Sequence, residues 1–192
     1  MTPSVYCTIG PFFPTQFAEG TNDLSQNEGK VAKGQHIFLS GRVLEKGGKP
    51  TVNTIVEIWQ PDAEGIFRHP LDARSAQADP GFFGWGRACT DSEGRYRFRT
   101  VLPGAYEGRA PHLNLMLLAI GLTRRLVTTV FFSDGRSDPF EGVRDPVLDC
   151  VDASRRPRLF AQRDPSADAL GALAYRFDIV LHGDNETPFF LD

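Results

Sequence analysis

The chain has 192 residues, a length that suits one domain with a sizeable core. Hydrophobic residues make up 41% and charged residues 23%, which is typical of a folded protein and excludes a disordered tail. The net charge of −3 disfavours nucleic acid or an anionic membrane as a partner. No apolar run approaches the roughly 20 residues that cross a bilayer, and the first residues lack a secretory signal. We therefore expect a cytoplasmic protein.

Three cysteines, Cys7, Cys89 and Cys150, are spread widely along the chain. Their odd number and scattered spacing exclude a disulfide framework and a CxxC metal motif. We expect buried free thiols in a reducing compartment.

Short strands separated by turn residues dominate the pattern. In 95–101 the arginines fall on one face and Tyr96 and Phe98 on the other, which is the alternation of a half-buried strand. The same alternation gives 175–181 one apolar face. Further strands are expected at 36–44, 54–59, 113–119 and 126–132, and the run 189–191 could close a sheet edge.

A single helix is expected near 153–162, where Ser154 could cap the first turn and Pro157 lies early enough to be tolerated. These elements predict an all-β fold, an antiparallel β-sandwich with one short late helix. We expect one domain over 1–192, with an irregular N-terminal arm at 1–30 and the β-sandwich at 31–192. The long loops at 61–88 and 135–172 indicate a bound partner or ligand.

The densest group of candidate chemical side chains is Tyr106, Glu107, Arg109, His112 and Asn114. One phenol and one imidazole are too few for an iron site, and Asn is a poor ligand for Fe(III). The residues alone favour His112 as a hydrogen-bonded, buried side chain at the start of a strand.

Other polar residues give no complete site. His36, His69 and His182 are dispersed, and none is predicted to be catalytic. The aspartates at 134, 138, 145, 149 and 152 alternate with Arg136 and Arg144, which predicts a solvated acidic loop rather than a calcium site.

Several segments resemble the intradiol ring-cleaving dioxygenase family. The resemblance lies in Leu-Ser-Gly-Arg-Val at 39–43, Val-Glu-Ile-Trp-Gln-Pro-Asp at 56–62, the Thr-Asp-x-x-Gly-x-Tyr-x-Phe-x-Thr segment within 90–106, and Ala-Pro-His-Leu-Asn at 110–114. With 8–12, 175–179 and 187–190 it spans nearly the whole chain.

The resemblance implies an iron site that this chain has lost. Catalytic members hold Fe(III) with two tyrosines and two histidines, and Tyr106 and His112 match one of each. Asn114 stands at the second histidine position and Arg74 at the first tyrosine position, where its charge would repel a metal. The four are remnant ligand positions, so the resemblance implies neither a metal ligand nor a catalytic residue in this chain.

The pattern is similar to that of alpha chains, whose partner in the family is a homologous iron-binding beta subunit. The resemblance then implies a higher oligomer of alpha–beta units that acts on O2 and on protocatechuate or a related catechol. It also implies that the arm lines the pocket of the partner chain through Thr8, Gly10, Pro11 and Phe12.

Ile120 departs from the alpha-chain pattern, because it replaces the arginine of an Ala-Arg-Gly segment near the mouth of the site. Loss of that cation weakens attraction for a carboxylated catechol, so another substituted catechol stays open as the substrate. Two rival hypotheses also stay open. One is a divergent dioxygenase that uses Tyr106 and His112 as a reduced iron site, and the other is a non-enzymatic β-sandwich binding module.

Overall fold

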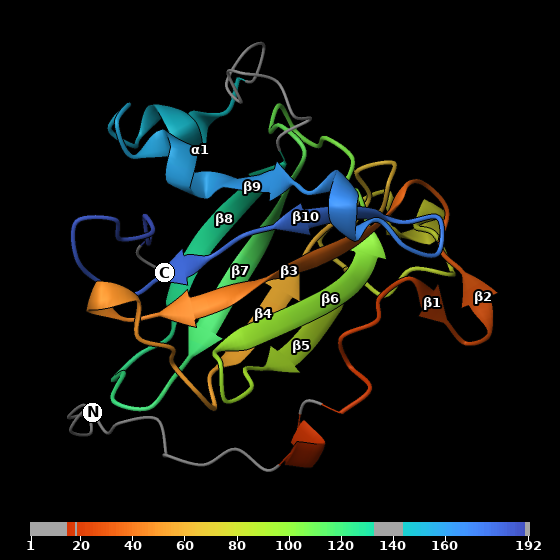
Figure 1. Ribbon diagram of the computed structural model, residues 1–192. Helices are drawn as coiled ribbons and strands as arrows, with labels where there is room; N and C mark the ends of the chain where they lie inside the picture. Colours follow the sequence, from red (N-terminus) through yellow and green to blue (C-terminus); the bar gives the residue numbers. More distant parts are fainter. Residues whose placement is uncertain (1–14, 18, 133–143, 191–192) are drawn as a thin grey trace, which may run out of the picture.

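The computed structural model describes residues 15–17, 19–132 and 144–190, and this part of the chain is mostly β-structure (Figure 1). Its strands are β1 (Gln26–Asn27), β2 (Lys30–Val31), β3 (His36–Leu44), β4 (Ile55–Trp59), β5 (Trp85–Cys89), β6 (Arg95–Val101), β7 (His112–Leu118), β8 (Leu126–Phe132), β9 (Phe160–Arg163), β10 (Leu173–Arg176) and β11 (Ile179–Val180). The described residues contain one α-helix, α1 (Pro146–Asp149), and 3-10 helices at Thr15–Phe17, Lys46–Gly48, Ser75–Gln77, Arg156–Leu159 and Pro165–Ala167.

Among the described residues, nine strands form one mixed sheet and β1 pairs with β2 in a small hairpin. In the large sheet β6 pairs antiparallel with β3, and β10 and β11 pair parallel with the other edge of β3. The sheet continues through β9, β8, β7 and β4 to β5. It curls so that α1 and β9 lie at one end of the molecule, away from β5 and β6 (Figure 1).

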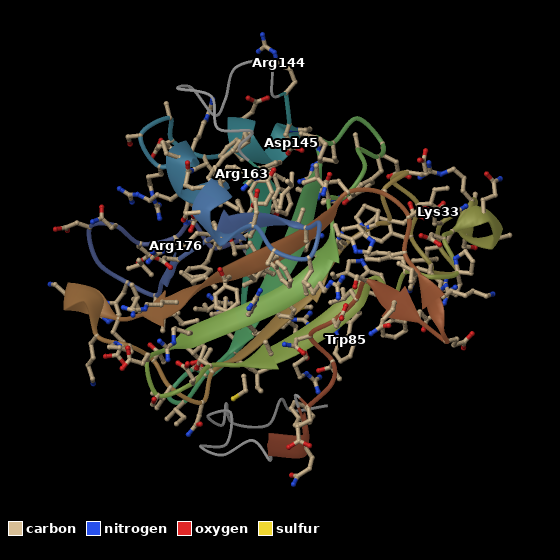
Figure 2. All side chains as sticks on the ribbon, turned by 45° about the vertical axis from the view of Figure 1, so that its right-hand side comes forward. Lys33, Trp85, Arg144, Asp145, Arg163 and Arg176 are labelled. Atoms are coloured by element: carbon tan, nitrogen blue, oxygen red, sulfur yellow. The ribbon has the colours of Figure 1, made fainter. Side chains whose placement is uncertain are left out.

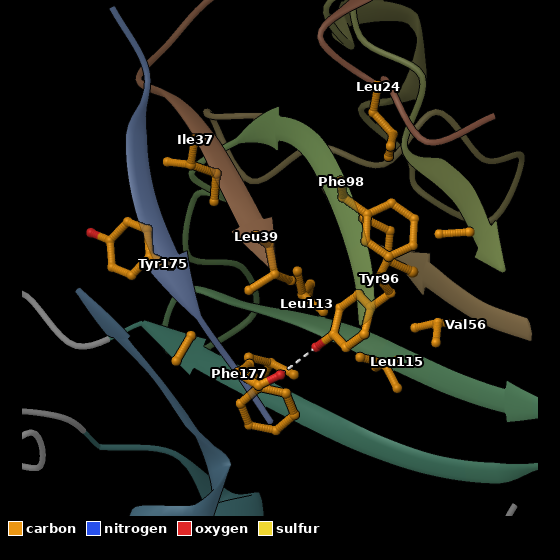
Figure 3. Close-up of a cluster of buried hydrophobic side chains, with 14 of the residues drawn as sticks. Leu24, Ile37, Leu39, Val56, Tyr96, Phe98, Leu113, Leu115, Tyr175 and Phe177 are labelled. Carbon is orange, nitrogen blue, oxygen red and sulfur yellow. Dashed lines mark hydrogen bonds between the residues drawn. The ribbon is translucent and has the colours of Figure 1, made fainter. Parts of the chain in front are cut away.

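The main core fills the inside of this curled sheet. Along β6 the exposed arginines alternate with Tyr96 and Phe98, which are buried at 3% and 0% exposure, as the alternation predicts. Figure 3 shows these rings packed among side chains from β3, β4 and β7. The Tyr96 hydroxyl donates a hydrogen bond to the Phe177 carbonyl at 2.6 Å, which joins β6 to the segment between β10 and β11.

A short extended segment, residues 21–24, bridges β5 and β6. On one side the Arg87 amide donates to the Thr21 carbonyl at 3.0 Å. On the other, the Leu24 amide donates to the Arg99 carbonyl at 2.8 Å, and the Arg99 amide donates to Asn22. Leu24 is 1% exposed, so this part of the chain is fixed to the body of the fold.

The all-β, sandwich-like fold and the single short helix late in the chain are confirmed. Three strand pairs are parallel: β3 with β10, β3 with β11, and β8 with β9. The alternation of apolar and polar residues does not show whether a strand runs parallel or antiparallel to its neighbour. The strand expected at 175–181 is divided between β10 and β11, because the Asp178 carboxylate accepts the Arg42 amide at 3.0 Å where a ladder bond would lie.

The helix expected at 153–162 is wrong in position. That range holds only the 3-10 turn Arg156–Leu159 before β9 begins at Phe160, because the buried Phe160 and Ala161 join the sheet beside β8. The expected loop 61–88 ends in a strand, since β5 starts at Trp85.

The cysteine expectation is partly wrong. Cys89 is half-buried and Cys150 is exposed, and both thiols are free, while Cys7 lies outside the described residues. No helix in the described part of the chain has the length and apolar character needed to cross a membrane.

Candidate functional site

Tyr106 opens a tight turn that returns the chain toward β7. The Arg109 amide donates to the Tyr106 carbonyl at 2.7 Å, and the two central residues, Glu107 and Gly108, have φ values of 47° and 76°. Two positive φ angles in succession are the geometry of a type I′ turn, which favours Gly at its second centre. The turn places the Tyr106 ring 5.2 Å from the ring of His112, the first residue of β7.

Tyr106 and His112 are hydrogen-bonded to each other. The Tyr106 Oη lies 3.1 Å from His112 Nε2, and His112 Nδ1 lies 2.7 Å from the Ala110 carbonyl oxygen. A carbonyl only accepts, so we assign the proton to Nδ1, which leaves Nε2 to accept from the phenol. The phenol and the imidazole therefore satisfy each other in their neutral forms.

Burial favours those neutral forms. It raises the pKa of the Tyr106 phenol, and the Arg109 cation opposes this rise. For His112, which is 1% exposed, burial lowers the pKa of the imidazole, and the hydrogen bond to Ala110 opposes this fall. Binding a metal would require the phenol to lose its proton and the pair to give up this hydrogen bond.

The two other remnant positions lie close to this pair. Asn114 lies on the same face of β7 as His112, and its Oδ1 accepts a hydrogen bond from the Thr129 hydroxyl at 3.2 Å. Arg74 lines the same hollow as Tyr106, and its Nη2 donates to the Gly65 carbonyl at 2.7 Å. The fold therefore places Arg74 and Tyr106 on one hollow, and Asn114 beside His112 on one face of β7.

The hollow has a volume of about 430 Å³ and aromatic walls. Trp59 stacks on Phe67 with ring centroids 5.8 Å apart, and Phe67 meets Tyr106 edge to face at 4.9 Å. His69 contacts the Trp59 ring at 5.9 Å and lines the same space. Sequence reasoning missed Trp59, which ends β4, because its pairing with Asn114 of β7 is not local. It missed Phe67 and His69 because nothing local shows how their loop folds.

Two carboxylates fold that loop. Asp62 is buried and accepts the amides of Ile66 and Asp79 at 2.9 Å each. Asp72 accepts the amides of Phe67 and Arg74, and these backbone hydrogen bonds are the main reason that its pKa is lowered. These hydrogen bonds from backbone amides to Asp carboxylates hold the conformation of the loop that carries Arg74.

A buried ion pair supports the other side of the site. Asp145 accepts Arg109 Nε at 2.7 Å and the Ala110 amide at 3.0 Å, and thereby holds the segment that leads into His112. Figure 2 shows Asp145 turned toward the body of the molecule, whereas its neighbour Arg144 reaches outward. Asp145 is 2% exposed, so the expected solvated acidic loop is wrong at this residue.

These residues do not fit an iron ion. Tyr106 and His112 use their ligand atoms on each other, and the other two positions carry an amide and a guanidinium. Arg109 adds a second cation nearby, and its buried Nη2 has no hydrogen-bond partner among the described residues.

The family model described as "Dioxygenase" matches residues 8–183. The chain is 41% identical to the protocatechuate 3,4-dioxygenase beta chain of Burkholderia cepacia, over 87% of this chain and 74% of that one. It is 34% identical to the alpha chain from the same organism, over 98% and 96%. The chain belongs to the intradiol dioxygenase family.

Solved structures share the fold of this intradiol dioxygenase-family chain. The intradiol ring-cleavage dioxygenase from Tetranychus urticae has a TM-score of 0.62 at 21% identity, and the alignment covers 93% of this chain and 95% of that one. The dioxygenase domain of a carbohydrate-binding fusion from Streptomyces sp. SirexAA-E has a TM-score of 0.61 at 23% identity, and the alignment covers 97% of this chain and 100% of that one.

Of the remaining predicted residues of this family member, only Ile120 lies in the described part of the chain. Thr8, Gly10, Pro11 and Phe12 lie outside the described residues. Ile120 is 49% exposed and lies in the turn after β7, at the opposite end of that strand from His112. Eight residues of extended chain separate them by about 26 Å, so Ile120 cannot act at this chain's own hollow.

Proposed function

We propose that this chain is the non-catalytic alpha subunit of a protocatechuate 3,4-dioxygenase. The observation that carries the proposal is the state of the four remnant ligand positions. Tyr106 and His112 are hydrogen-bonded to each other, and Arg74 and Asn114 replace the other two ligands. The family uses non-haem Fe(III), which in this proposal is bound by the beta subunit.

The ligand positions support an alpha role more directly than overall identity does. Identity is higher to a beta chain, at 41% against 34%, but the match to the alpha chain is nearly end to end. Iron binding depends on a few side chains. A cation at one of these positions lowers the affinity for iron more than many neutral substitutions elsewhere in the chain.

The reaction in this proposal is the O2-dependent cleavage of protocatechuate to 3-carboxy-cis,cis-muconate. The bond between the two hydroxylated ring carbons breaks, and both atoms of O2 enter the product as carboxylate oxygens. This chain supplies pocket walls and excludes water, while the homologous beta subunit supplies the metal. The alpha–beta pair repeats in a higher oligomer.

The N-terminal arm is the part of the chain that we assign to the partner's pocket, within a single domain over 1–192. Thr8, Gly10, Pro11 and Phe12 would form its substrate-facing end. The described residues support an anchored starting point for that arm: the Arg87 guanidinium lies 3.6 Å from the centre of the Phe17 ring and donates to the Phe17 carbonyl at 3.2 Å. Glu57 accepts two bonds from the same guanidinium and holds it in place.

The deciding experiment is purification of the chain alone and together with an iron-bearing homologue. We expect the chain alone to be colourless and iron-free, and the co-expressed pair to form a complex that cleaves protocatechuate. Stoichiometric iron and a visible tyrosinate-to-iron band in the chain alone would make it a catalytic chain. Failure to form any complex would instead support a binding module.

Gly10→Trp tests the arm in the reconstituted complex. We expect assembly to persist and turnover to fall sharply, because a bulky ring would enter the pocket. Gln16→Trp, in the exposed turn before the anchored Phe17, is the matched control and should leave turnover unchanged. Equal kinetics for Gly10→Trp and the unaltered chain would show that the arm does not reach the substrate pocket.

A further inference from the structure

An open groove lies on the outer face of the sheet, on the side away from the core. It has a volume of about 910 Å³ and is lined by strands β3, β5 and β6 together with residues of β10 and of the bridging segment. The side chains used below are Asn22, Ser40, Arg42, Arg95, Arg97 and Arg176. None of them belongs to the hollow beside Tyr106, so this groove, called here the β3–β6 groove, is a separate feature.

Most arginines of the groove already have a carboxylate. Arg95 pairs with Asp91 at 2.8 Å, Arg176 with Asp178 at 2.8 Å, and Arg42 with Glu93 at 3.6 Å. These pairs are solvated and each contributes little to stability, but each gives its arginine a carboxylate partner within the chain.

Arg97 is different, because its guanidinium has no hydrogen bond or ion pair within the described part of the chain. The guanidinium instead lies over Phe38, whose ring centre is 4.0 Å from the guanidinium carbon. A cation over a ring face is attracted by the ring without using its N–H donors. The contact therefore orients Arg97 and leaves its donors available, and a preoriented guanidinium loses little freedom when it binds.

Ser40 adds a second uncommitted donor. It is the direct cross-strand neighbour of Arg97, so the two side chains project from the same face of the sheet. The described residues offer its hydroxyl no hydrogen-bond partner, although Ser40 lines the groove. Asn22 donates to the Arg97 carbonyl at 3.1 Å and holds the backbone at this point.

The charge of the groove selects the kind of anion. Its lining contains four arginines (42, 95, 97 and 176) and four carboxylates (Glu19, Asp91, Asp164 and Asp178). This balance gives a polyanion such as a nucleic acid no net attraction. Because Glu93, beyond the lining, partners Arg42, Arg97 is the one arginine of the lining without a carboxylate partner among the described residues.

We propose that the β3–β6 groove binds a single carboxylate. Arg97 holds its two oxygens through parallel N–H donors, and the Ser40 hydroxyl donates a third hydrogen bond. The carboxylate could belong to a free organic acid or to an acidic side chain of a partner subunit, and the experiment separates these two sources. The proposal is independent of the assignment as an alpha subunit.

The test is a titration of the full ¹⁵N-labelled chain with benzoate, with benzamide as its uncharged analogue. We expect benzoate to shift the Arg97 Nε–H and Ser40 amide resonances in a saturable way, and benzamide to leave them in place. Arg97→Gln should raise the benzoate Kd by about tenfold, and Ser40→Ala by about threefold. Arg68→Gln, an exposed arginine outside the groove, should change nothing.

Arg97→Lys separates weaker binding from a loss of folding. It keeps a cation over Phe38 but lacks the planar pair of N–H donors. We expect it to bind benzoate several-fold more weakly with an otherwise unchanged spectrum. Equal benzoate binding by Arg97→Gln and the unaltered chain, or equal shifts with benzamide, would overturn the proposal.

The same titration of the complex with the iron-bearing homologue identifies the source. If the groove takes a free acid, benzoate binds the complex as it binds the chain alone. If a partner's acidic side chain fills the groove, assembly abolishes benzoate binding, and Arg97→Gln weakens assembly.

Discussion

The Tyr106 Oη lies 3.1 Å from His112 Nε2, so the two side chains that we assign to remnant ligand positions are hydrogen-bonded to each other. Protonation of Nε2 would reverse this hydrogen bond, because Nε2–H would then donate to the phenol oxygen. Burial also lowers the pKa of His112. The pH dependence of stability should therefore report on this pair.

We predict that acid destabilises the fold through His112. The pKa of His112 in the folded chain lies below the value of about 6.5 in the unfolded chain. Below that pH the unfolded chain therefore binds a proton at His112 before the folded chain does. The contribution of His112 to the free energy of unfolding should thus be constant above about pH 7 and fall as the pH drops toward the folded-state pKa.

Urea denaturation at pH 8, 6.5 and 5.5 measures this effect, with His112→Gln as the comparison. The variant should be less stable at pH 8 but should lose less stability on acidification, since the other histidines are common to both proteins. Parallel pH profiles for the two proteins would show that another group titrates instead.

We predict that the iron site can be rebuilt with two substitutions. Arg74→Tyr and Asn114→His together would place a second tyrosine and a second histidine near Tyr106, which lines the same hollow as Arg74, and His112, which is hydrogen-bonded to Tyr106. The Arg74 side chain is 44% exposed, so its replacement disturbs little packing.

The double variant should bind Fe(III) with a visible tyrosinate-to-iron absorption, and each single variant should bind it much more weakly. Adding His112→Ala to the double variant is the control and should abolish the band. A colourless double variant with native stability would mean that the loop around Arg74 is not placed as an iron site requires.

Several strands could be predicted from the sequence almost residue by residue. His36–Leu44, Arg95–Val101 and Leu126–Phe132 match because each carries its own pattern of buried and exposed side chains. β5 and β9 could not be predicted, because they form only through neighbours distant in the chain: β5 pairs with β4, and β9 lies between β8 and β10.

The candidate site divides in the same way. Tyr106 and His112 are six residues apart across one tight turn, so their proximity follows from local sequence. The position of His69 depends on Asp62 and Asp72 folding a long loop, which no local pattern reveals. Asp145 could have been found, because Asp followed by Pro146 is a helix start, and its carboxylate accepts the Val147 amide at 2.9 Å.

We predict a large loss of stability for Asp145→Ala. Its carboxylate is fully buried and pairs with Arg109, so the substitution leaves a mostly buried cation and the Ala110 amide without their acceptor. Breaking such a pair costs about 3 kcal/mol or more of unfolding free energy. Asp149→Ala, an exposed aspartate in the same helix, should change stability by about 0.5 kcal/mol or less in a urea titration.

Tyr96→Phe should cost about 1–2 kcal/mol, because it removes the donor to the buried Phe177 carbonyl (Figure 3). Burial holds the Tyr96 pKa well above its ordinary value. Above about pH 10 the unfolded chain therefore loses a proton that the folded chain retains, and stability falls as the pH rises. Urea titrations at pH 8 and 10.5 should show this extra loss only in the chain that keeps Tyr96; an equal loss in Tyr96→Phe would assign it to other groups.

Ile120→Arg tests whether the turn after β7 faces the partner's substrate. Ile120 is 49% exposed, so the longer side chain fits without loss of stability. In the complex with the iron-bearing subunit, a cation there should lower the KM for protocatechuate by about threefold to tenfold, because it attracts the ring carboxylate. Unsubstituted catechol lacks that carboxylate, and its KM should change little. Ile120→Gln controls for the added length. Equal shifts in KM for both substrates, or an effect of Gln as large as that of Arg, would place Ile120 away from the substrate and leave the choice of catechol to the partner chain.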